Sequence, residues 1–176
     1  MKPGERVLDL ACGTGTLAIM AKRAEPKAEV IGLDGDLEIL RRARQKADEA
    51  GTEIGLDQGL STELPYPDQA FDTVLSTLFF HHLTLPAKQQ TAREIARVLK
   101  PGGRLRVADW GRPRDPLMAV LFLGVRILDG FEQTRENVAG KLPKVFADAG
   151  LIWVEEAGGL RTVFGSLAFY RAETRA

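Results

Sequence analysis

The sequence predicts an α/β fold: a doubly wound sheet of seven strands, mostly parallel, with an antiparallel strand at its C-terminal end. Short β-rich runs alternate with helical patterns along most of the chain, which is typical of a parallel sheet covered on both faces. The last two β-rich runs have no helix-length connection between them, which predicts an antiparallel pair. The 176 residues, 44% of them hydrophobic, are enough for one domain spanning residues 1–176.

The first half of the chain contains four expected strands and two expected helices. The strands are short apolar runs at residues 6–10, 29–33, about 53–57 and 71–76. The helices lie at residues 17–24 and 37–50. Asp36 is expected to cap the second helix through its carboxylate, and Gly51 is expected to end it in a left-handed conformation.

The second half contains three expected helical regions and three expected strands. The helices lie at residues 86–99, 116–128 and 135–149, the last with a break at Gly140. The strands lie at residues 104–108, about 152–156 and 164–171. The Lys-Pro-Gly-Gly sequence at 100–103 is expected to end the first of these helices. Helix 116–128 is apolar on nearly all sides, so we expect it to be a core helix, to cover a hydrophobic pocket or to form a dimer contact.

Charge and cysteine content exclude several classes of function. With 24 basic and 24 acidic residues, the chain has no global field that would attract nucleic acid or an anionic membrane. Cys12 is the single cysteine, which excludes a disulfide framework and a cysteine-cluster metal site and suits a reducing compartment. The longest apolar stretch, residues 117–128, contains Arg126 and is too short to span a bilayer. Since no secretory leader is expected either, we predict a soluble, cytoplasmic protein without stable membrane insertion.

A glycine-containing loop between the first strand and the first helix indicates nucleotide binding. Residues 7–15 read Val-Leu-Asp-Leu-Ala-Cys-Gly-Thr-Gly, and Asp34 ends the next strand, where an acid can accept both hydroxyls of a ribose. A dinucleotide site would need glycine at positions 11, 13 and 16, but the chain has Ala11 and Thr16. No Gly-Lys-Ser/Thr sequence is present, so a phosphate-binding P-loop is excluded as well.

This loop resembles the first motif of class I S-adenosylmethionine (SAM)-dependent methyltransferases, Asp/Glu-x-Gly-x-Gly-x-Gly, with Ala11 in place of the first glycine. Three further segments extend the resemblance over nearly the whole chain, at residues 59–72, 99–103 and 146–151. The sequence is most similar to the branch that contains ubiquinone and menaquinone C-methyltransferases. The resemblance implies a Rossmann-like sheet, SAM as the cofactor and methyl transfer as the reaction.

The resemblance also implies a set of cofactor-binding residues. Asp9 is suited to the ammonium group of SAM, directly or through water, and Asp34 to its ribose. The full set is Asp9, Ala11, Cys12, Gly13, Gly15, Asp34, Gly35, Gly59, Leu60, Ser61, Ser76 and Thr77. Relatives usually carry an acid directly after the glycine at position 59, where it binds the adenine amino group, but this chain has Leu60. We therefore expect the adenine amino group to donate to Ser61, Thr62, a backbone carbonyl or water.

Candidate catalytic residues follow the fourth and fifth expected strands, at the carboxyl ends where open α/β sheets bind ligands. His81 and His82 follow the fourth strand, and Asp109 ends the fifth. One histidine could take a proton from the methyl acceptor. The alternative is that His82 caps or packs against a neighbouring helix while His81 lines the pocket without titrating. No metal is expected, because adjacent histidines rarely converge on one ion.

The methyl acceptor is expected to be a small molecule, methylated on O, N or C, and a lipophilic one if helix 116–128 covers the pocket. Enzymes that methylate nucleobases carry an Asn/Asp-Pro-Pro-aromatic clamp where this chain reads Ser-Thr-Leu-Phe at 76–79, so nucleic acid is not an expected partner.

Two alternatives to an active methyltransferase remain. The first is a module that binds SAM or S-adenosylhomocysteine without productive transfer. Two features favour it: Leu60, and the expected absence of the lid helices that relatives usually have ahead of the first strand. The second, a nicotinamide-dependent oxidoreductase, is disfavoured by Ala11 and Thr16. A homodimer, or helix 116–128, is expected to close the open site.

Overall fold

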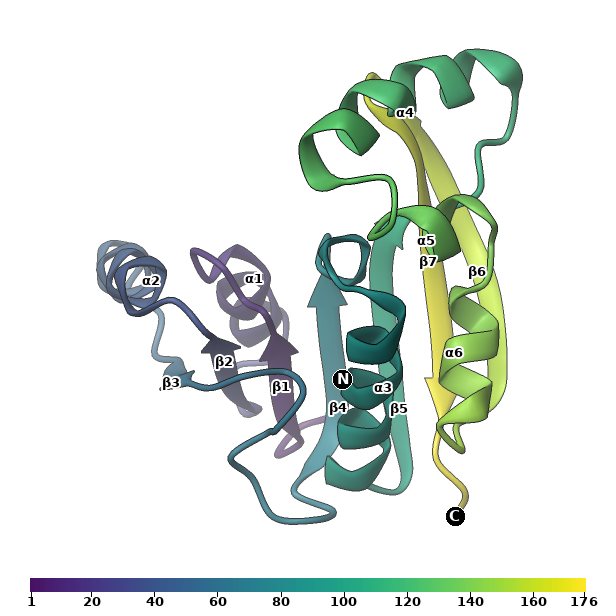
Figure 1. Cartoon of the computed structure of the whole chain (residues 1–176). Coiled ribbons are helices and arrows are strands. Elements are labelled where there is room, and N and C mark those ends of the chain that lie inside the picture. The colour runs from purple at the N-terminus through teal and green to yellow at the C-terminus, as the bar shows by residue number, and fades with distance from the viewer.

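Within residues 1–128 and 130–176, which this computed structural model describes, seven strands form one mixed sheet in the order β3-β2-β1-β4-β5-β7-β6 (Figure 1). The strands are β1 (Arg6–Leu10), β2 (Glu29–Asp34), β3 (Gly55–Gln58), β4 (Phe71–Thr77), β5 (Leu99–Trp110), β6 (Ile152–Thr162) and β7 (Gly165–Glu173). Neighbours among the first five strands are parallel, whereas β7 is antiparallel to both β5 and β6. The predicted doubly wound sheet with an antiparallel C-terminal strand is confirmed.

Helices cover both faces of the sheet, and each face has its own hydrophobic core. The helices are α1 (Thr16–Ala24), α2 (Leu37–Glu49), α3 (Leu85–Val98), α4 (Pro116–Asp129), α5 (Arg135–Val138) and α6 (Leu142–Asp148), and a short 3₁₀ turn, η1, spans Phe80–His82. Side chains alternate along a strand, so Leu8 of β1 faces the core made with α3 and α6, and Val7 faces the core made with α1 and α2. The connections from β1 and from β4 therefore leave the sheet toward opposite faces.

The element boundaries agree with the sequence where local capping determines them. The Asp36 carboxylate accepts hydrogen bonds from the backbone N–H groups of Glu38 (2.8 Å) and Ile39 (3.4 Å), so α2 begins as predicted. Gly51, directly after α2, has a φ angle of 58°, in the left-handed region that glycine adopts without strain.

Two strands are longer than predicted because of pairing that is distant in sequence. β5 begins at Leu99 rather than at 104, since the C-terminal residues 174 and 175 form backbone hydrogen bonds with Gly103 and Gly102. β6 continues to Thr162, well beyond the predicted 156, because β7 pairs with it up to the hairpin turn. The Lys-Pro-Gly-Gly sequence at 100–103, expected only to end the preceding helix, is therefore part of β5.

Helix α4 lies beyond the carboxyl ends of β4 and β5, against the hairpin of β6 and β7 (Figure 1). Phe122 is buried over Gly165 of β7, and Met118 is buried one turn earlier. Six other large apolar residues of the helix are between 37% and 86% exposed: Leu117, Val120, Leu121, Leu123, Ile127 and Leu128. Of the three interpretations of this helix, burial in the core is therefore contradicted.

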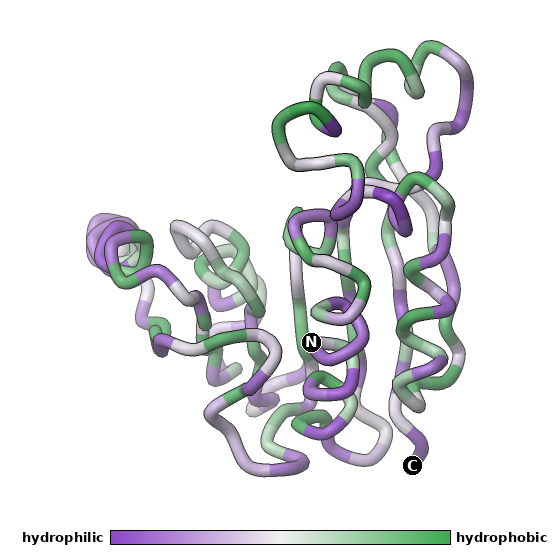
Figure 2. The backbone as a smooth tube through the Cα atoms, viewed as in Figure 1, coloured by the Kyte–Doolittle hydropathy of each residue, from purple (hydrophilic) through white to green (hydrophobic). Residues whose placement is uncertain are grey.

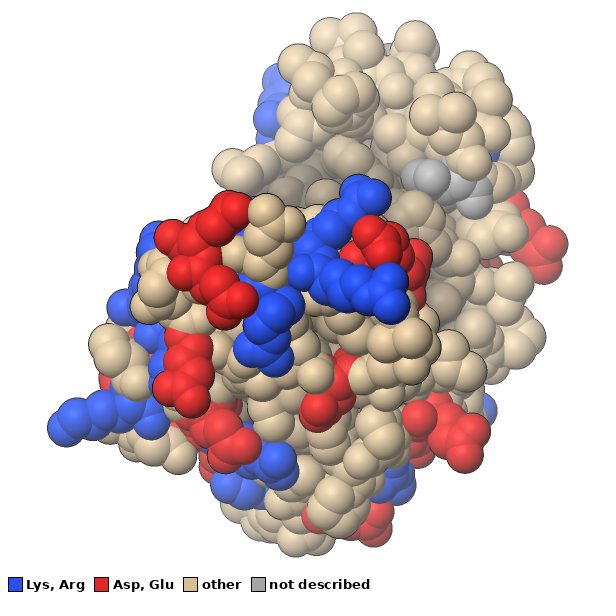
Figure 3. Space-filling model, turned by 90° about the vertical axis from the view of Figure 1, so that its left-hand side faces the viewer, with Lys and Arg blue, Asp and Glu red and all other residues tan. Residues whose placement is uncertain are grey.

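The upper end of the molecule is apolar and carries few charges on the face seen in Figure 3. Figure 2 shows green, hydrophobic residues along most of α4. Figure 3 shows acidic and basic side chains mixed over the lower part of the molecule, whereas its upper part is almost entirely uncharged. Within residues 1–128 and 130–176, no helix has the length and apolar character needed to cross a membrane.

Candidate functional site

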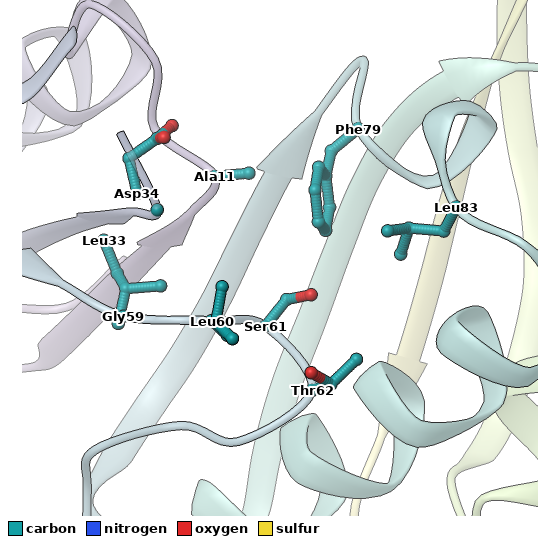
Figure 4. A pocket seen from close by; sticks show the side chains of 10 residues that line it. Ala11, Leu33, Asp34, Gly59, Leu60, Ser61, Thr62, Phe79 and Leu83 are labelled. Atoms are coloured by element: carbon teal, nitrogen blue, oxygen red, sulfur yellow. The ribbon is translucent and has the colours of Figure 1, made fainter. Parts of the chain in front are cut away.

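A cavity of about 360 Å³ opens at the carboxyl ends of β1 and β2, beside the turn that follows β4 (Figure 4). Its lining residues are Ala11, Leu33, Asp34, Gly35, Gly59, Leu60, Ser61, Thr62, Phe79 and Leu83. β1 and β4 are neighbours whose following helices cover opposite faces of the sheet, and such a switch point is where open α/β sheets bind ligands. Six residues that the sequence predicts as cofactor-binding line this cavity: Ala11, Asp34, Gly35, Gly59, Leu60 and Ser61.

The loop after β1 turns sharply and lays its backbone against β2. Gly13 and Gly15 have φ angles of 53° and 72°, which glycine adopts freely. Ala11 also lies in the left-handed region, with a φ angle of 56°, and its methyl group points into the cavity. A residue with a Cβ atom is strained there, so the alanine costs about 1 kcal/mol relative to an unstrained residue. The backbone N–H of Cys12 donates to the carbonyl of Leu33 and fixes the loop to the end of β2 (2.9 Å).

The Asp34 carboxylate is held at the wall of the cavity by backbone donors. One oxygen accepts from the N–H of Gly13 (2.9 Å) and the other from the N–H of Asp36 (3.0 Å). A carboxylate has about four lone-pair sites, so two remain for other donors. Asp34 is therefore oriented in advance and can still accept the two hydroxyls of a ribose.

Asp9, on β1, is a buried acid whose carboxylate oxygens have no close hydrogen-bond partner. Its side chain is 1% exposed, and neither carboxylate oxygen accepts a hydrogen bond. Burial raises the pKa of Asp9 from 3.8 to about 7; the backbone N–H of Ala18 opposes this rise, and the charge of Asp34 adds to it. A cation beside this carboxylate would stabilise its charged form, so the residue fits an ammonium group.

Leu60, at the position where the resemblance implies an acid, is 64% exposed at the edge of the cavity. The carbonyl of Leu60 accepts a hydrogen bond from the N–H of Glu63 (3.1 Å). The hydroxyls of Ser61 and Thr91 of α3 are hydrogen-bonded to each other at 2.9 Å. The Leu60 carbonyl and the Ser61 hydroxyl thus each already have one hydrogen-bond partner, while Thr62 also lines the cavity.

The other predicted cofactor residues do not line this cavity. Cys12, Gly13 and Gly15 belong to the loop beside it, and burial raises the pKa of the Cys12 thiol to about 12, which makes it unreactive. Ser76 and Thr77 line a second cavity of about 370 Å³ together with residues of α1, β5, β6 and β7.

The three candidate catalytic residues lie close together at the carboxyl ends of β4 and β5. His81 is buried, and its Nδ1 atom is 2.7 Å from Oδ1 of Asp109, which is fully buried. His82 is exposed, and its ring lies on that of His81 with 4.0 Å between centroids. Of the predicted pair, it is therefore His81 that the structure joins to the acid. Among the residues described, no group of three potential metal ligands comes together.

Several residues of the site were not predicted from the sequence. Phe79 and Leu83 line the cavity on either side of the histidine pair, and Leu33 lies at the end of β2. Asn137 of α5 donates from its Nδ2 atom to Oδ1 of Asp109 (3.2 Å). Phe79 and Leu83 could have been predicted, because they are close to His81 in the sequence. Asn137 could not, because it is 28 residues from Asp109 in the sequence and reaches it only through the fold.

A family described as a methyltransferase domain matches residues 7–103. A demethylmenaquinone methyltransferase of Lactobacillus johnsonii is 40% identical over 121 residues, which cover 67% of this chain and 49% of the relative. A demethylmenaquinone methyltransferase of Listeria welshimeri is 34% identical over 189 aligned positions, covering 94% of this chain and 79% of the relative. The chain spans about half the length of several such curated relatives. The crystal structure of the YcgJ protein from Bacillus subtilis has a similar fold, with a TM-score of 0.80 at 21% identity, over 99% of this chain and 94% of that protein.

Proposed function

Because the chain belongs to the class I SAM-dependent methyltransferases, we propose that it transfers a methyl group from SAM to a small, lipophilic acceptor. The observation that carries the proposal is the pair of carboxylates at the ends of neighbouring strands. Asp9 of β1 is buried without a partner, and Asp34 of β2 is oriented at the wall of the cavity. One charged group fits an ammonium, and the other fits a pair of hydroxyls.

The residues around the cavity fit the parts of SAM. Asp9 would hold the ammonium group of the amino-acid part, and Asp34 would accept the ribose hydroxyls. Leu33 and Leu60 offer apolar surface for the faces of the adenine ring, with Thr62 as a polar neighbour. When bound, SAM supplies a methyl group that its sulfonium already activates for displacement.

The chain's own contribution to the reaction is orientation, exclusion of water and a proton acceptor. Phe79 and Leu83 present apolar surface at the side of the cavity toward η1, where they can exclude water from the reacting atoms. His81 lies between them in sequence and has Asp109 at its Nδ1 atom. We assign to His81 the role of accepting the proton that a hydroxyl or carbon-acid acceptor must lose. Asp109 acts through His81, since its carboxylate is fully buried.

The proposed acceptor is a naphthoquinone ring, in its reduced form, with an apolar tail. The names of the relatives, demethylmenaquinone methyltransferase and 2-phytyl-1,4-naphtoquinone methyltransferase, support this class. The exposed apolar residues of α4 lie at the same end of the sheet as the cavity and support a lipophilic tail. We also propose a cytoplasmic location and a homodimer, in which the exposed apolar residues of α4 would contact a second copy.

Methyl transfer from labelled SAM to an acceptor panel tests the proposed function. The panel contains a reduced 2-alkyl-1,4-naphthoquinone, a catechol and a small amine. We expect labelled product with the naphthoquinol. Binding of SAM and S-adenosylhomocysteine in calorimetry, without label transfer to any member of the panel, would instead support the binding module. Binding of NAD alone would contradict both.

A further inference from the structure

We propose that Thr91, Glu94 and Arg97 of α3 are positioning residues for SAM, which hold the loop between β3 and β4 in the conformation that forms the adenine side of the cavity. The placement of adenine against this loop belongs to the proposed function, and the inference rests on it. The hydrogen bonds between α3 and the loop are features of the chain itself.

The loop of residues 59–70 forms one wall of the cavity. Residues 59–62 all line it, and they follow one another along this wall in Figure 4. At the start of the loop, the backbone N–H of Gly59 donates to the carbonyl of Asp34 at the end of β2 (3.1 Å). All of residues 59–70 are described, and they form no helix and pair with no strand of the sheet. Their backbone groups therefore need partners elsewhere.

Helix α3 supplies such partners from one of its sides. Thr91, Glu94 and Arg97 are spaced three residues apart, which places neighbouring members of the series next to each other on the helix surface. The hydroxyl of Thr91, a fully buried residue, is hydrogen-bonded to the hydroxyl of Ser61 at 2.9 Å. The Glu94 carboxylate accepts a hydrogen bond from the backbone N–H of Leu64 (2.8 Å). Two positions of the loop, one of which lines the cavity, are thus held directly from α3.

Arg97 binds the loop at three further points. Its guanidinium donates to the backbone carbonyls of Leu64 (3.1 Å) and Tyr66 (2.8 Å) and to the carboxylate of Asp68 (3.0 Å). It also donates to both carboxylate oxygens of Glu94, at 2.9 and 2.7 Å. These two hydrogen bonds lower the pKa of Glu94, so its carboxylate stays charged at neutral pH. A guanidinium has five N–H donors in a rigid fork, so one arginine can bind all these acceptors together, whereas a lysine cannot.

Other contacts of the loop hold its side chains rather than these backbone groups. The Leu64 side chain is buried in the core, and the Tyr66 hydroxyl donates to Asp57 of β3 (2.9 Å). The backbone groups at positions 64 and 66 are bound by Glu94 and Arg97 instead. Without that binding, the backbone would be free to rotate about its side-chain anchors. Since apparent affinity falls with the fraction of protein in the binding conformation, we expect weaker SAM binding rather than a slower chemical step.

Calorimetric titration with SAM tests the inference in variants of α3. Arg97→Met keeps the apolar stem but removes the donors, and it should lower SAM affinity about tenfold, as when one molecule in ten has the binding conformation. Thr91→Val removes the hydroxyl at nearly constant volume and should also weaken binding, whereas Thr91→Ser keeps the hydroxyl and should restore it. Arg93→Met is the matched control, because Arg93 is exposed on the same helix and binds Gln90 rather than the loop. It should leave SAM affinity unchanged.

Hydrogen exchange and kinetics separate positioning from a general loss of stability. In the protein without ligand, mass spectrometry should show faster amide exchange of residues 59–66 in Arg97→Met but not in Arg93→Met. Exchange of the loop at residues 11–15 should be unchanged in both. With a reduced 2-alkyl-1,4-naphthoquinone as acceptor, Arg97→Met should raise the KM for SAM about tenfold and change kcat at saturating SAM less than about twofold.

The outcomes that would overturn the inference are distinct from those that would refute the proposed function. Unchanged SAM affinity in folded Arg97→Met would overturn it even if Tm falls, since the residue would then act on stability alone. Weaker binding without faster exchange of residues 59–66 would also overturn it. If Arg97→Met does not fold, Thr91→Val decides by the same two measurements. An unmodified protein that does not bind SAM would refute the proposed function, and the exchange would still decide whether α3 holds the loop.

Discussion

Replacing Asp9 with asparagine should stabilise the protein without ligand and weaken its hold on SAM. The substitution keeps the size of the side chain but removes a charge that is buried without a hydrogen-bond partner. Burial raises the pKa of Asp9 in the folded protein from 3.8 to about 7. The folded state therefore binds this proton more tightly than the unfolded state, and stability decreases as the pH rises from about 4 through about 7.

The size of the effect follows from this pKa shift. A shift of one pKa unit corresponds to 1.36 kcal/mol, so a rise from 3.8 to about 7 corresponds to about 4 kcal/mol at pH 8. For a domain of this length, a change of 1 kcal/mol moves Tm by about 2–4 °C, so we expect Asp9→Asn to raise Tm by about 10 °C at pH 8. Below pH 4 both proteins carry a neutral side chain, and the difference should nearly vanish.

Thermal unfolding between pH 4 and pH 8, together with calorimetric titration with SAM, measures both effects. SAM affinity should fall about tenfold to a hundredfold in Asp9→Asn, since a hydrogen bond to a charged group contributes about 1.5–3 kcal/mol. Asp34→Asn is the control: its carboxylate accepts two backbone hydrogen bonds, so it should weaken SAM binding without raising Tm. A Tm gain that does not depend on pH, or SAM binding that Asp9→Asn leaves intact, would refute the reasoning.

Four further substitutions have defined outcomes. Leu60→Asp should tighten SAM binding by calorimetry with little effect on Tm, because the position is 64% exposed; unchanged or weaker binding would mean that position 60 does not contact adenine. Ala11→Gly should raise the free energy of unfolding in denaturant by about 1 kcal/mol, since glycine relieves the strain at a φ angle of 56°; a loss of stability would contradict this. Phe122→Ala should destabilise the protein by about 3–5 kcal/mol, because that ring is buried. Ile127→Ser, at a 65% exposed position of the same helix, should instead raise the KM for a lipophilic acceptor while sparing SAM affinity and Tm, and an unchanged KM would exclude α4 from acceptor binding.

The fold was predictable because its signals are local. Apolar runs, the cap at Asp36 and the turn at Gly51 determine where strands and helices begin and end, and these features were read correctly. The lengths of β5 and β6 were not, since their additional residues are held by partners from β7 and the C-terminus. A strand end set by such distant pairing has no signature in its own sequence.

The candidate site was predictable on its cofactor side and less so on its catalytic side. The glycine-containing loop directly follows β1, and Asp34 directly ends β2. The sequence spacing between this loop and Asp34 therefore indicates the cavity that both line. The sequence also pointed to His81 and Asp109, but their pairing, and the exposure of His82, depend on how η1 packs over β5. Asn137 was missed because its segment reaches Asp109 through α5, and nothing in the local pattern predicts that approach.

Of the three interpretations of α4, the core helix is contradicted for a different reason. A helix that is apolar on nearly all sides is usually buried. Among the described residues of this helix, only two large apolar side chains, Met118 and Phe122, are less than one tenth exposed. The rest of the helix extends beyond the sheet (Figure 1). Its composition indicated a need for apolar surroundings but not what supplies them.

The most direct test of the central claim is a single incubation of the protein with SAM that carries a deuterated methyl group and with a reduced 2-alkyl-1,4-naphthoquinone, followed by mass spectrometry of the acceptor. We predict a product that contains one deuterated methyl group in place of hydrogen, with the product greatly reduced when Asp34→Asn replaces the unmodified protein. An acceptor of unchanged mass, under conditions in which calorimetry shows SAM to be bound, would contradict the proposed methyl transfer to this class of acceptor.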